Sequence, residues 1–317
     1  MARILIHEVG PRDGLQAESQ VVPTATKLDW LERLIASGVD IVQVGSFVHP
    51  EKVPQMADTD ELFRRLTAAK RAPGAVLSGL VLNEKGLERG LACGVEMFCL
   101  GVSASETHSR RNTGMGTAEA TQRIVATALA ARRAGREVQV SVQSAFGCGF
   151  EGQVPEARVM EIVAAYLTAG FEAISLADTA GHAHPAQVEG YVRRILALAP
   201  GARITAHIHN TYGVGMANVY AAIGAGATAI ETSFGGLGGC PFTKVAAGNV
   251  ATEDLVHALQ RAGECAGIDL AALVGVARDV AAFFGRELPG CVYRTGPIAG
   301  EAAAPRAVQE SGPGERL

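Results

Sequence analysis

Two histidines separated by one residue are the side chains of this 317-residue chain best suited to chemistry. His207 and His209 occupy alternate positions in the sequence HIH, within an apolar stretch. On a β-strand both imidazoles would point to the same face, because side chains alternate along a strand. Two imidazoles on one face can bind a divalent cation, although such a pair can also be a structural feature of a protein interior.

Asp13 and Asn249 could supply the oxygen atoms that such a cation needs. Asp13 lies in the motif GPRDG at positions 10–14, and Asn249 follows a glycine-rich run at 235–239. Two imidazoles, one carboxylate and one amide oxygen, with positions left open for substrate or water, suit a divalent ion that acts as a Lewis acid. The donor set indicates Mg²⁺ or Mn²⁺, with Zn²⁺ as an open alternative.

Arg12, Cys240 and Asp178 are further candidates for the same site. Arg12 precedes Asp13, where its guanidinium could stabilise an anion or enolate, or simply form a surface ion pair. Cys240 follows the glycine run, so its thiol could exchange a proton with a substrate or be an incidental loop residue. Asp178 directly follows a predicted strand. His7, within the first apolar stretch, is interpreted as a core residue.

The elements that must position these residues form a repeating pattern. Eight short apolar stretches are predicted as strands, at 4–9, 41–46, 76–81, 97–103, 138–144, 173–177, 204–209 and 229–233. Amphipathic segments with helical spacing lie between them, for example at 24–37, 117–134, 156–169, 186–198 and 214–225.

Alternation of strands and helices predicts parallel βαβ units and, with eight of them, a closed (β/α)₈ TIM barrel. A doubly wound open sheet is the alternative, but GPRDG stands where that fold carries its phosphate-binding glycines. We expect one domain over residues 1–298 that includes an additional C-terminal helical segment, with helices at 248–262 and 270–285, followed by a disordered tail at 299–317. The candidate residues fall at carboxyl ends of strands, where barrel enzymes have their active sites.

Composition gives no sign of a nucleic-acid or membrane partner. The chain has 28 basic and 32 acidic side chains, a net charge of −4, and no long block of either sign. Its six cysteines form no CxxC pair, and it has no apolar run of about 18 residues and no signal-peptide pattern. We expect a cytoplasmic protein and, by default for a soluble barrel, a homodimer.

The motifs together resemble the 3-hydroxy-3-methylglutaryl-CoA lyase family of metal-dependent lyases. The resemblance runs from about residue 4 to 285, and the segment after the eighth strand is its most specific part. The matching stretches are EVGPRDGLQ at 8–16, SFVHPEKVPQMAD at 46–58, SLADTAG at 175–181, HIHNTYG at 207–213 and SFGGLGGCPFTKVAAGNVATEDL at 233–255.

The resemblance implies a retro-Claisen cleavage of an acyl-CoA substrate, with 3-hydroxy-3-methylglutaryl-CoA giving acetyl-CoA and acetoacetate. It implies four metal ligands, Asp13, His207, His209 and Asn249. Arg12 would stabilise the enolate and Cys240 would take part in proton transfer, and His207 and Asp178 join them as catalytic candidates. Glu8 and Glu253 match polar positions that support the site.

Two positions depart from the family pattern. Gln43 and Asn210 stand where the family usually has Glu and Asp, so the site loses two carboxylates and the acyl group of the substrate is open. A synthase or aldolase that condenses acetyl-CoA with a 2-oxo acid is a second hypothesis, and a non-catalytic metal-binding barrel is a third.

Overall fold

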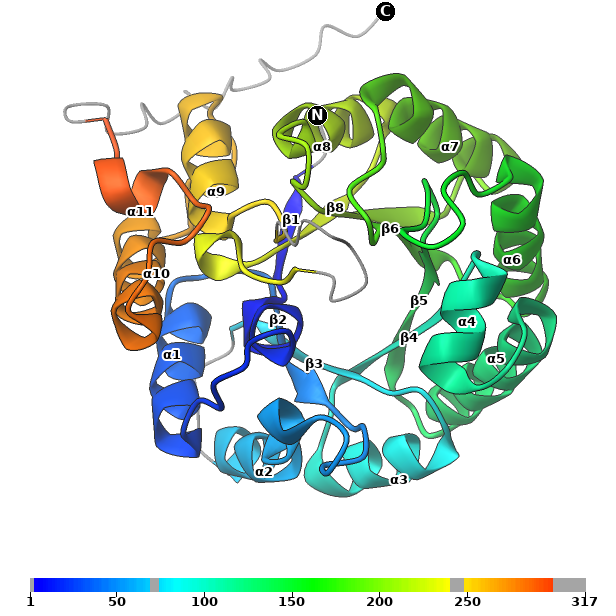
Figure 1. Ribbon diagram of the computed structural model, residues 1–317, viewed down its shortest axis with the longest axis horizontal. Helices are drawn as coiled ribbons and strands as arrows, with labels where there is room; N and C mark the ends of the chain where they lie inside the picture. Colours follow the sequence, from blue (N-terminus) through cyan, green and yellow to red (C-terminus); the bar gives the residue numbers. More distant parts are fainter. Residues whose placement is uncertain (1–2, 69–73, 240–247, 299–317) are drawn as a thin grey trace, which may run out of the picture.

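Eight parallel strands close into a barrel in the order of the chain, and β1 pairs with both β2 and β8 (Figure 1). The computed structural model describes residues 3–68, 74–239 and 248–298. The closed sheet confirms the predicted (β/α)₈ fold and excludes the open sheet. The strands are β1 (Leu5–Glu8), β2 (Ile41–Ser46), β3 (Val76–Leu80), β4 (Met97–Ser103), β5 (Glu137–Gln143), β6 (Ala173–Asp178), β7 (Arg203–Ile208) and β8 (Ala229–Thr232).

Helices surround the barrel, and α10 packs between α1 and α9 next to the closure between β8 and β1 (Figure 1). The helices are α1 (Thr24–Ala36), α2 (Thr59–Ala68), α3 (Glu84–Cys93), α4 (Glu106–Thr113), α5 (Thr117–Arg133), α6 (Glu156–Thr168), α7 (Pro185–Leu198), α8 (Gly215–Ala225), α9 (Thr252–Arg261), α10 (Leu270–Phe284) and α11 (Val292–Thr295). α10 and α11 form the predicted C-terminal addition. Residues 299–317, predicted as a disordered tail, lie outside the described residues.

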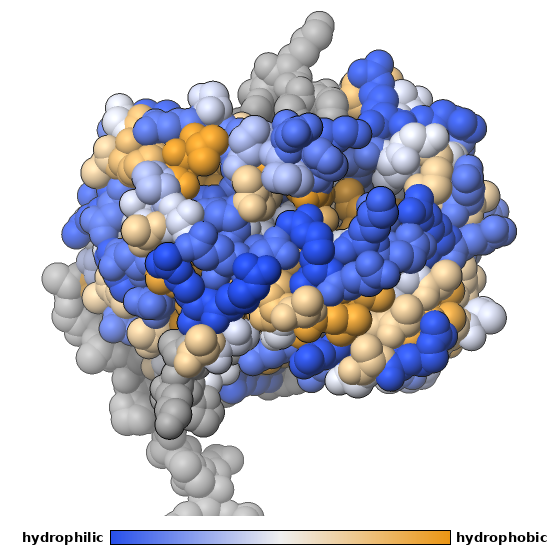
Figure 2. All heavy atoms as spheres, turned by 90° about the horizontal axis from the view of Figure 1, so that it is seen from below, coloured by the Kyte–Doolittle hydropathy of each residue, from blue (hydrophilic) through white to orange (hydrophobic). Residues whose placement is uncertain are grey.

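Alternate side chains of each strand point into the barrel or outward to the helices. On β4, Cys99 faces the cavity at the barrel mouth, whereas Phe98 packs outward against α3. A Cβ atom at Gly90 of α3 would lie 2.5 Å from Phe98 Cε1, so glycine permits this close approach. Hydrophilic side chains cover much of the outer surface seen in Figure 2, with apolar ones in small patches.

The segment after β8 differs from the prediction in a way that matters for the site. The predicted helix over 248–262 begins only at Thr252. Asn249 and Ala251 instead form isolated β-bridges with His209 and Ser233, because extended backbone here adds to the carboxyl ends of β7 and β8. Asn249 therefore lies beside the second histidine. In the described part of the chain, no helix has the length and apolar character needed to cross a bilayer.

Phe98→Ala should lower the free energy of unfolding by about 3–5 kcal/mol, because it removes a fully buried ring between β4 and α3. Urea denaturation followed by circular dichroism measures this loss. Tyr220→Ala is the control, since Tyr220 on α8 is 44% exposed and its loss should cost no more than about 0.5 kcal/mol. Equal losses in the two variants would contradict the packing described.

Candidate active site

The motif GPRDG forms a single π-helical turn, η1 (Gly10–Gly14), directly after β1. The backbone N–H of Asp13 donates to Val9 O at 2.7 Å, which ties the turn to the end of the strand. A Cβ atom at Gly10 would lie 2.6 Å from both the Glu8 carboxylate and the Phe234 ring, so a side chain there would force the turn outward. The glycine thus allows η1 to carry Arg12 and Asp13 over the mouth of the barrel.

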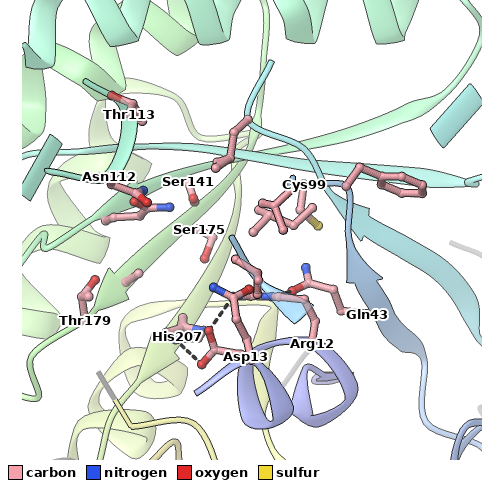
Figure 3. Close-up of a pocket in the computed structure, with 18 of the residues that line it drawn as sticks. Arg12, Asp13, Gln43, Cys99, Asn112, Thr113, Ser141, Ser175, Thr179 and His207 are labelled. Carbon is pink, nitrogen blue, oxygen red and sulfur yellow. Dashed lines mark hydrogen bonds and ion pairs between the residues drawn. The ribbon is translucent and has the colours of Figure 1, made fainter. Parts of the chain in front are cut away.

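Asp13, His207 and His209 meet at this mouth, as the sequence predicted. Nε2 of His207 lies 3.0 Å from Nε2 of His209, and each nitrogen lies 3.8 Å from Oδ2 of Asp13. Both histidines are buried, with 5% of each residue exposed. Figure 3 shows Asp13 and His207 facing each other at one side of the cavity.

This triangle of atoms has dimensions that one divalent cation could span. Neighbouring ligands of an octahedral ion with bonds of about 2.1 Å are about 3.0 Å apart, and a small adjustment would bring the carboxylate to that distance. All three candidate ligand atoms lie within 4.8 Å of one another. Two imidazoles and a carboxylate are a donor set that suits such an ion.

Asn249, the fourth predicted ligand, contacts the same group. Its amide nitrogen donates to Asp13 Oδ2 at 2.7 Å and to Leu237 O at 3.0 Å. Its amide oxygen is buried and accepts no hydrogen bond from the described residues. The structure therefore places Asn249 against the cluster with its NH₂ group toward Asp13, and a half-turn of the amide would exchange the two atoms. Gly238 permits the contact, since a Cβ there would lie 2.5 Å from Asn249 Nδ2.

Arg12 lies between the cluster and Gln43, and 12% of its side chain is exposed. Its Nη1 donates to Asp13 Oδ1, and its Nε donates to Gln43 Oε1 (Figure 3). Gln43 is thus a neutral acceptor for the guanidinium. Asn210, the other departure from the family pattern, accepts the N–H of Gly215 at 2.8 Å and so supports the start of α8.

Electrostatic contacts within the cluster shift the pKa of its members. Burial acts to raise the pKa of Asp13, but the charges of Arg12 and the two imidazoles outweigh it and bring the pKa to about 2. Burial acts to lower the pKa of His207, but its contacts with Glu231 and Asp13 raise it overall. Asp13 is therefore a carboxylate near neutral pH, ready to bind a cation.

Glu231 is a site residue that the sequence prediction missed. It lies on β8 and is buried, and its Oε2 is 2.7 Å from Nδ1 of His207. A lone acidic residue in the short, fully buried strand AIET was the available signal. The sequence alone does not show that Glu231 lies opposite His207, because that contact depends on the pairing of β7 with β8.

A cavity of about 450 Å³ opens at the carboxyl ends of the strands, and its lining includes Arg12, Asp13, Gln43, His207, His209 and Glu231. Its inner wall is polar, and Figure 3 shows side chains from several strands pointing into it. Members of this wall include Cys99, Gln139, Ser141, Ser175 and Thr179, while His49, Lys52, His108, Asn112 and Arg123 also line the cavity.

Asp178, predicted as catalytic, is buried and is not among the residues that line this cavity. Its carboxylate accepts the backbone N–H groups of His182 at 2.8 Å and Ala183 at 3.2 Å. Burial raises its pKa to about 7. Through these hydrogen bonds Asp178 stabilises the loop between β6 and α7.

Glu8 and Glu253 are likewise buried in the wall around η1 and the loop after β8. Glu8 accepts N–H groups from Gly10 at 2.6 Å and Phe234 at 3.1 Å, and Glu253 accepts the N–H of Gly235 at 3.1 Å. Burial raises the pKa of Glu8 to about 7 and that of Glu253 to about 8. His7 is fully buried as predicted, and its Nε2 lies 2.9 Å from Ser78 Oγ. Cys240, the predicted loop thiol, lies outside the described residues.

A closed (β/α)₈ barrel with an acid–imidazole cluster at the carboxyl ends of its strands is the arrangement of a TIM-barrel enzyme. Residues 3–280 match the model of the HMGL-like family, and the chain belongs to that family. It is 40% identical to (R)-citramalyl-CoA lyase of Chloroflexus aurantiacus, over 94% of this chain and 96% of the relative. It is 35% identical to hydroxymethylglutaryl-CoA lyase YngG of Bacillus subtilis, over 90% and 95% of the two chains.

Solved structures agree with this assignment. An HMG-CoA lyase from Acinetobacter baumannii, in complex with coenzyme A and 3-methylmalate, superposes with a TM-score of 0.87 at 36% identity, covering 94% of this chain and 96% of that one. The chain is accordingly an enzyme, a carbon–carbon lyase of the hydroxymethylglutaryl-CoA lyase type. Family membership removes the non-catalytic alternative.

Glu8→Gln should make stability less dependent on pH between about 4.5 and 7. The unfolded chain releases the Glu8 proton near its ordinary pKa of 4.5, whereas the folded protein holds it up to about 7. The folded state therefore binds more protons in this window, and the free energy of unfolding falls as pH rises through it. The variant lacks this loss, so its stability relative to wild type should increase from pH 4 to pH 8.

Urea denaturation at pH 4, 6 and 8 measures the effect. Glu88→Gln, which removes an exposed carboxylate from α3, is the matched control. A stability difference between Glu8→Gln and wild type that stays constant over this range would contradict the raised pKa of Glu8.

Proposed function

We propose that this chain catalyses the metal-dependent retro-Claisen cleavage of a tertiary 3-hydroxyacyl-CoA, with acetyl-CoA as one product. The observation that carries the proposal is the triangle formed by Asp13, His207 and His209, in contact with Arg12, at one side of the cavity. The names of the relatives support the substrate class, since each is a lyase of an acyl-CoA thioester.

Asp13, His207 and His209 would hold the cation, with the Asn249 amide as a fourth ligand after a half-turn. A bound Mg²⁺ or Mn²⁺ would polarise the tertiary hydroxyl of the substrate and lower its pKa. Zn²⁺ is an alternative, because it also binds imidazole nitrogens and carboxylate oxygens, in tetrahedral sites. The low pKa of Asp13 keeps this ligand ionised across the neutral range.

The remaining chemistry falls to the side chains around the cluster. When a base in the cavity accepts the hydroxyl proton, the C–C bond can break, which leaves a carbonyl compound, the enolate of acetyl-CoA and the protonated base. Arg12 lies at the cavity wall with its guanidinium held by Asp13 and Gln43, and there it would offset the negative charge on the enolate oxygen. Cys240 is the proposed donor that returns a proton to the enolate carbon.

3-Hydroxy-3-methylglutaryl-CoA is the first candidate substrate, because several relatives at 34–38% identity are named as its lyases. Citramalyl-CoA is a second candidate, supported by the 40% identical relative. The neutral Gln43 beside Arg12 also favours it. Without a carboxylate at position 43 the site is more positive, which suits an acyl group whose own carboxylate is attached to the hydroxyl-bearing carbon.

The proposed partner is thus an acyl-CoA, whose phosphates would need cationic groups near the cavity mouth. Lys52 and Arg123 line the cavity and could meet them. The coenzyme A complex of the Acinetobacter relative supports an acyl-CoA as the partner. The homodimer and the cytoplasmic location expected from the sequence stay predictions.

The purified protein should release acetyl-CoA from 3-hydroxy-3-methylglutaryl-CoA, from citramalyl-CoA or from both, because both present a tertiary hydroxyl to the cluster. A coupled assay for acetyl-CoA measures this. Treatment with EDTA should abolish the release, and Mg²⁺ or Mn²⁺ should restore it. Condensation of acetyl-CoA with a 2-oxo acid, without cleavage of either thioester, would instead support the synthase hypothesis and contradict the proposal.

Arg12→Gln should lower kcat by about 10²–10³-fold, since it removes a positioned cationic donor from the developing enolate. Binding of Mn²⁺ should persist, because the proposed ligands remain. Arg203→Gln is the control, an identical change on an exposed residue at the opposite end of β7, and it should leave kcat unaltered. A kcat for Arg12→Gln within a few-fold of wild type would remove Arg12 from the mechanism.

A further inference from the structure

Glu231 places a carboxylate inside the barrel, at the level of His207. On β8 it pairs in register with His207 of β7 and with His7 of β1. All three side chains point into the barrel, and only 7% of the Glu231 side chain is exposed. Three adjacent strands therefore hold the two imidazoles and the carboxylate at one level, which leaves them little freedom to move.

The contacts of Glu231 divide its two oxygens between different partners. Oε2 lies 2.7 Å from Nδ1 of His207. Oε1 accepts a hydrogen bond from Nε2 of Gln139 and lies 3.5 Å from Nδ1 of His7. A buried carboxylate needs such donors to offset its desolvation, so the His207 contact requires a proton on Nδ1.

That proton determines what His207 can do at its other nitrogen. With Nδ1 occupied by the hydrogen bond to Glu231, a neutral imidazole has its lone pair on Nε2. Nε2 is the atom that lies 3.0 Å from His209 Nε2 and 3.8 Å from Asp13 Oδ2. The carboxylate thus fixes both the tautomer and the orientation of the ring, as partners of metal-binding histidines commonly do.

We infer that Glu231 is a positioning residue, which holds the His207 ring with its Nε2 lone pair toward the Asp13–His209 pair and thereby sets the affinity of the cluster for a divalent cation. The inference rests on the proposed function, because it takes the cluster as a cation site. It assigns to Glu231 no contact with the substrate.

The test compares Mn²⁺ affinity in wild type, Glu231→Gln and Asp40→Asn, using the electron paramagnetic resonance signal of free Mn²⁺ and the full-length protein. Glu231→Gln should raise the Kd for Mn²⁺ by about 10–100-fold, because it removes the charge that polarises His207. Asp40→Asn is the matched control. Asp40 lies just before β2, at the end of the barrel opposite the cluster, and its carboxylate accepts the N–H of Ile6 at 2.9 Å. The Kd of the Asp40→Asn variant for Mn²⁺ should therefore equal that of wild type.

Long-range ¹H–¹⁵N spectra of the histidine rings give a second measurement that needs no Glu231 variant. In the metal-free wild-type protein His207 should be the Nδ1–H tautomer, with its signals identified as those missing from the spectrum of His207→Gln. The Nε2–H tautomer would overturn the inference, as would unchanged Mn²⁺ affinity in a folded Glu231→Gln protein. Wild-type protein that binds no Mn²⁺ would instead refute the proposed function, so the two failures are distinct.

Discussion

The approach of the Asp13 carboxylate to the imidazoles of His207 and His209 is the interaction on which the rest of the site depends. Asp13 is nearly 200 positions away from the histidines in the sequence, and closure of β8 onto β1 brings them together. The π-helical turn η1 then carries Asp13 across the barrel mouth to 3.8 Å from both imidazoles. Burial acts to raise the pKa of Asp13, but the adjacent guanidinium of Arg12, and after it the two imidazoles, outweigh burial and keep the carboxylate ionised.

Buried carboxylates build the frame around this interaction. Glu8, Asp178 and Glu253 each accept backbone N–H groups from loops at the carboxyl ends of strands. Burial raises the pKa of all three, which indicates that each is held at an electrostatic cost. Their hydrogen bonds give the loops around the cavity defined backbone positions, and the site depends on those positions for its geometry.

Periodicity predicted all eight strands, and residue type predicted Asp13, His207 and His209, because alternation on a strand and the placement of barrel active sites are local rules. Features that depend on pairing between distant segments escaped prediction. The helix predicted from 248 begins at Thr252, because the backbone beside His209 is extended. The amide nitrogen of Asn249, and not its oxygen, faces Asp13. Glu231 was missed because its partner His207 lies on a different strand. Asp178, predicted as catalytic, accepts backbone N–H groups only four and five residues further along the chain.

Anomalous diffraction from crystals of the protein grown with Mn²⁺ tests the central claim most directly. The account predicts one strong manganese peak at the barrel mouth, within about 2.3 Å of Asp13 Oδ2 and of Nε2 of both His207 and His209. A map from fully occupied crystals with no peak there, or with manganese bound only elsewhere, would contradict it.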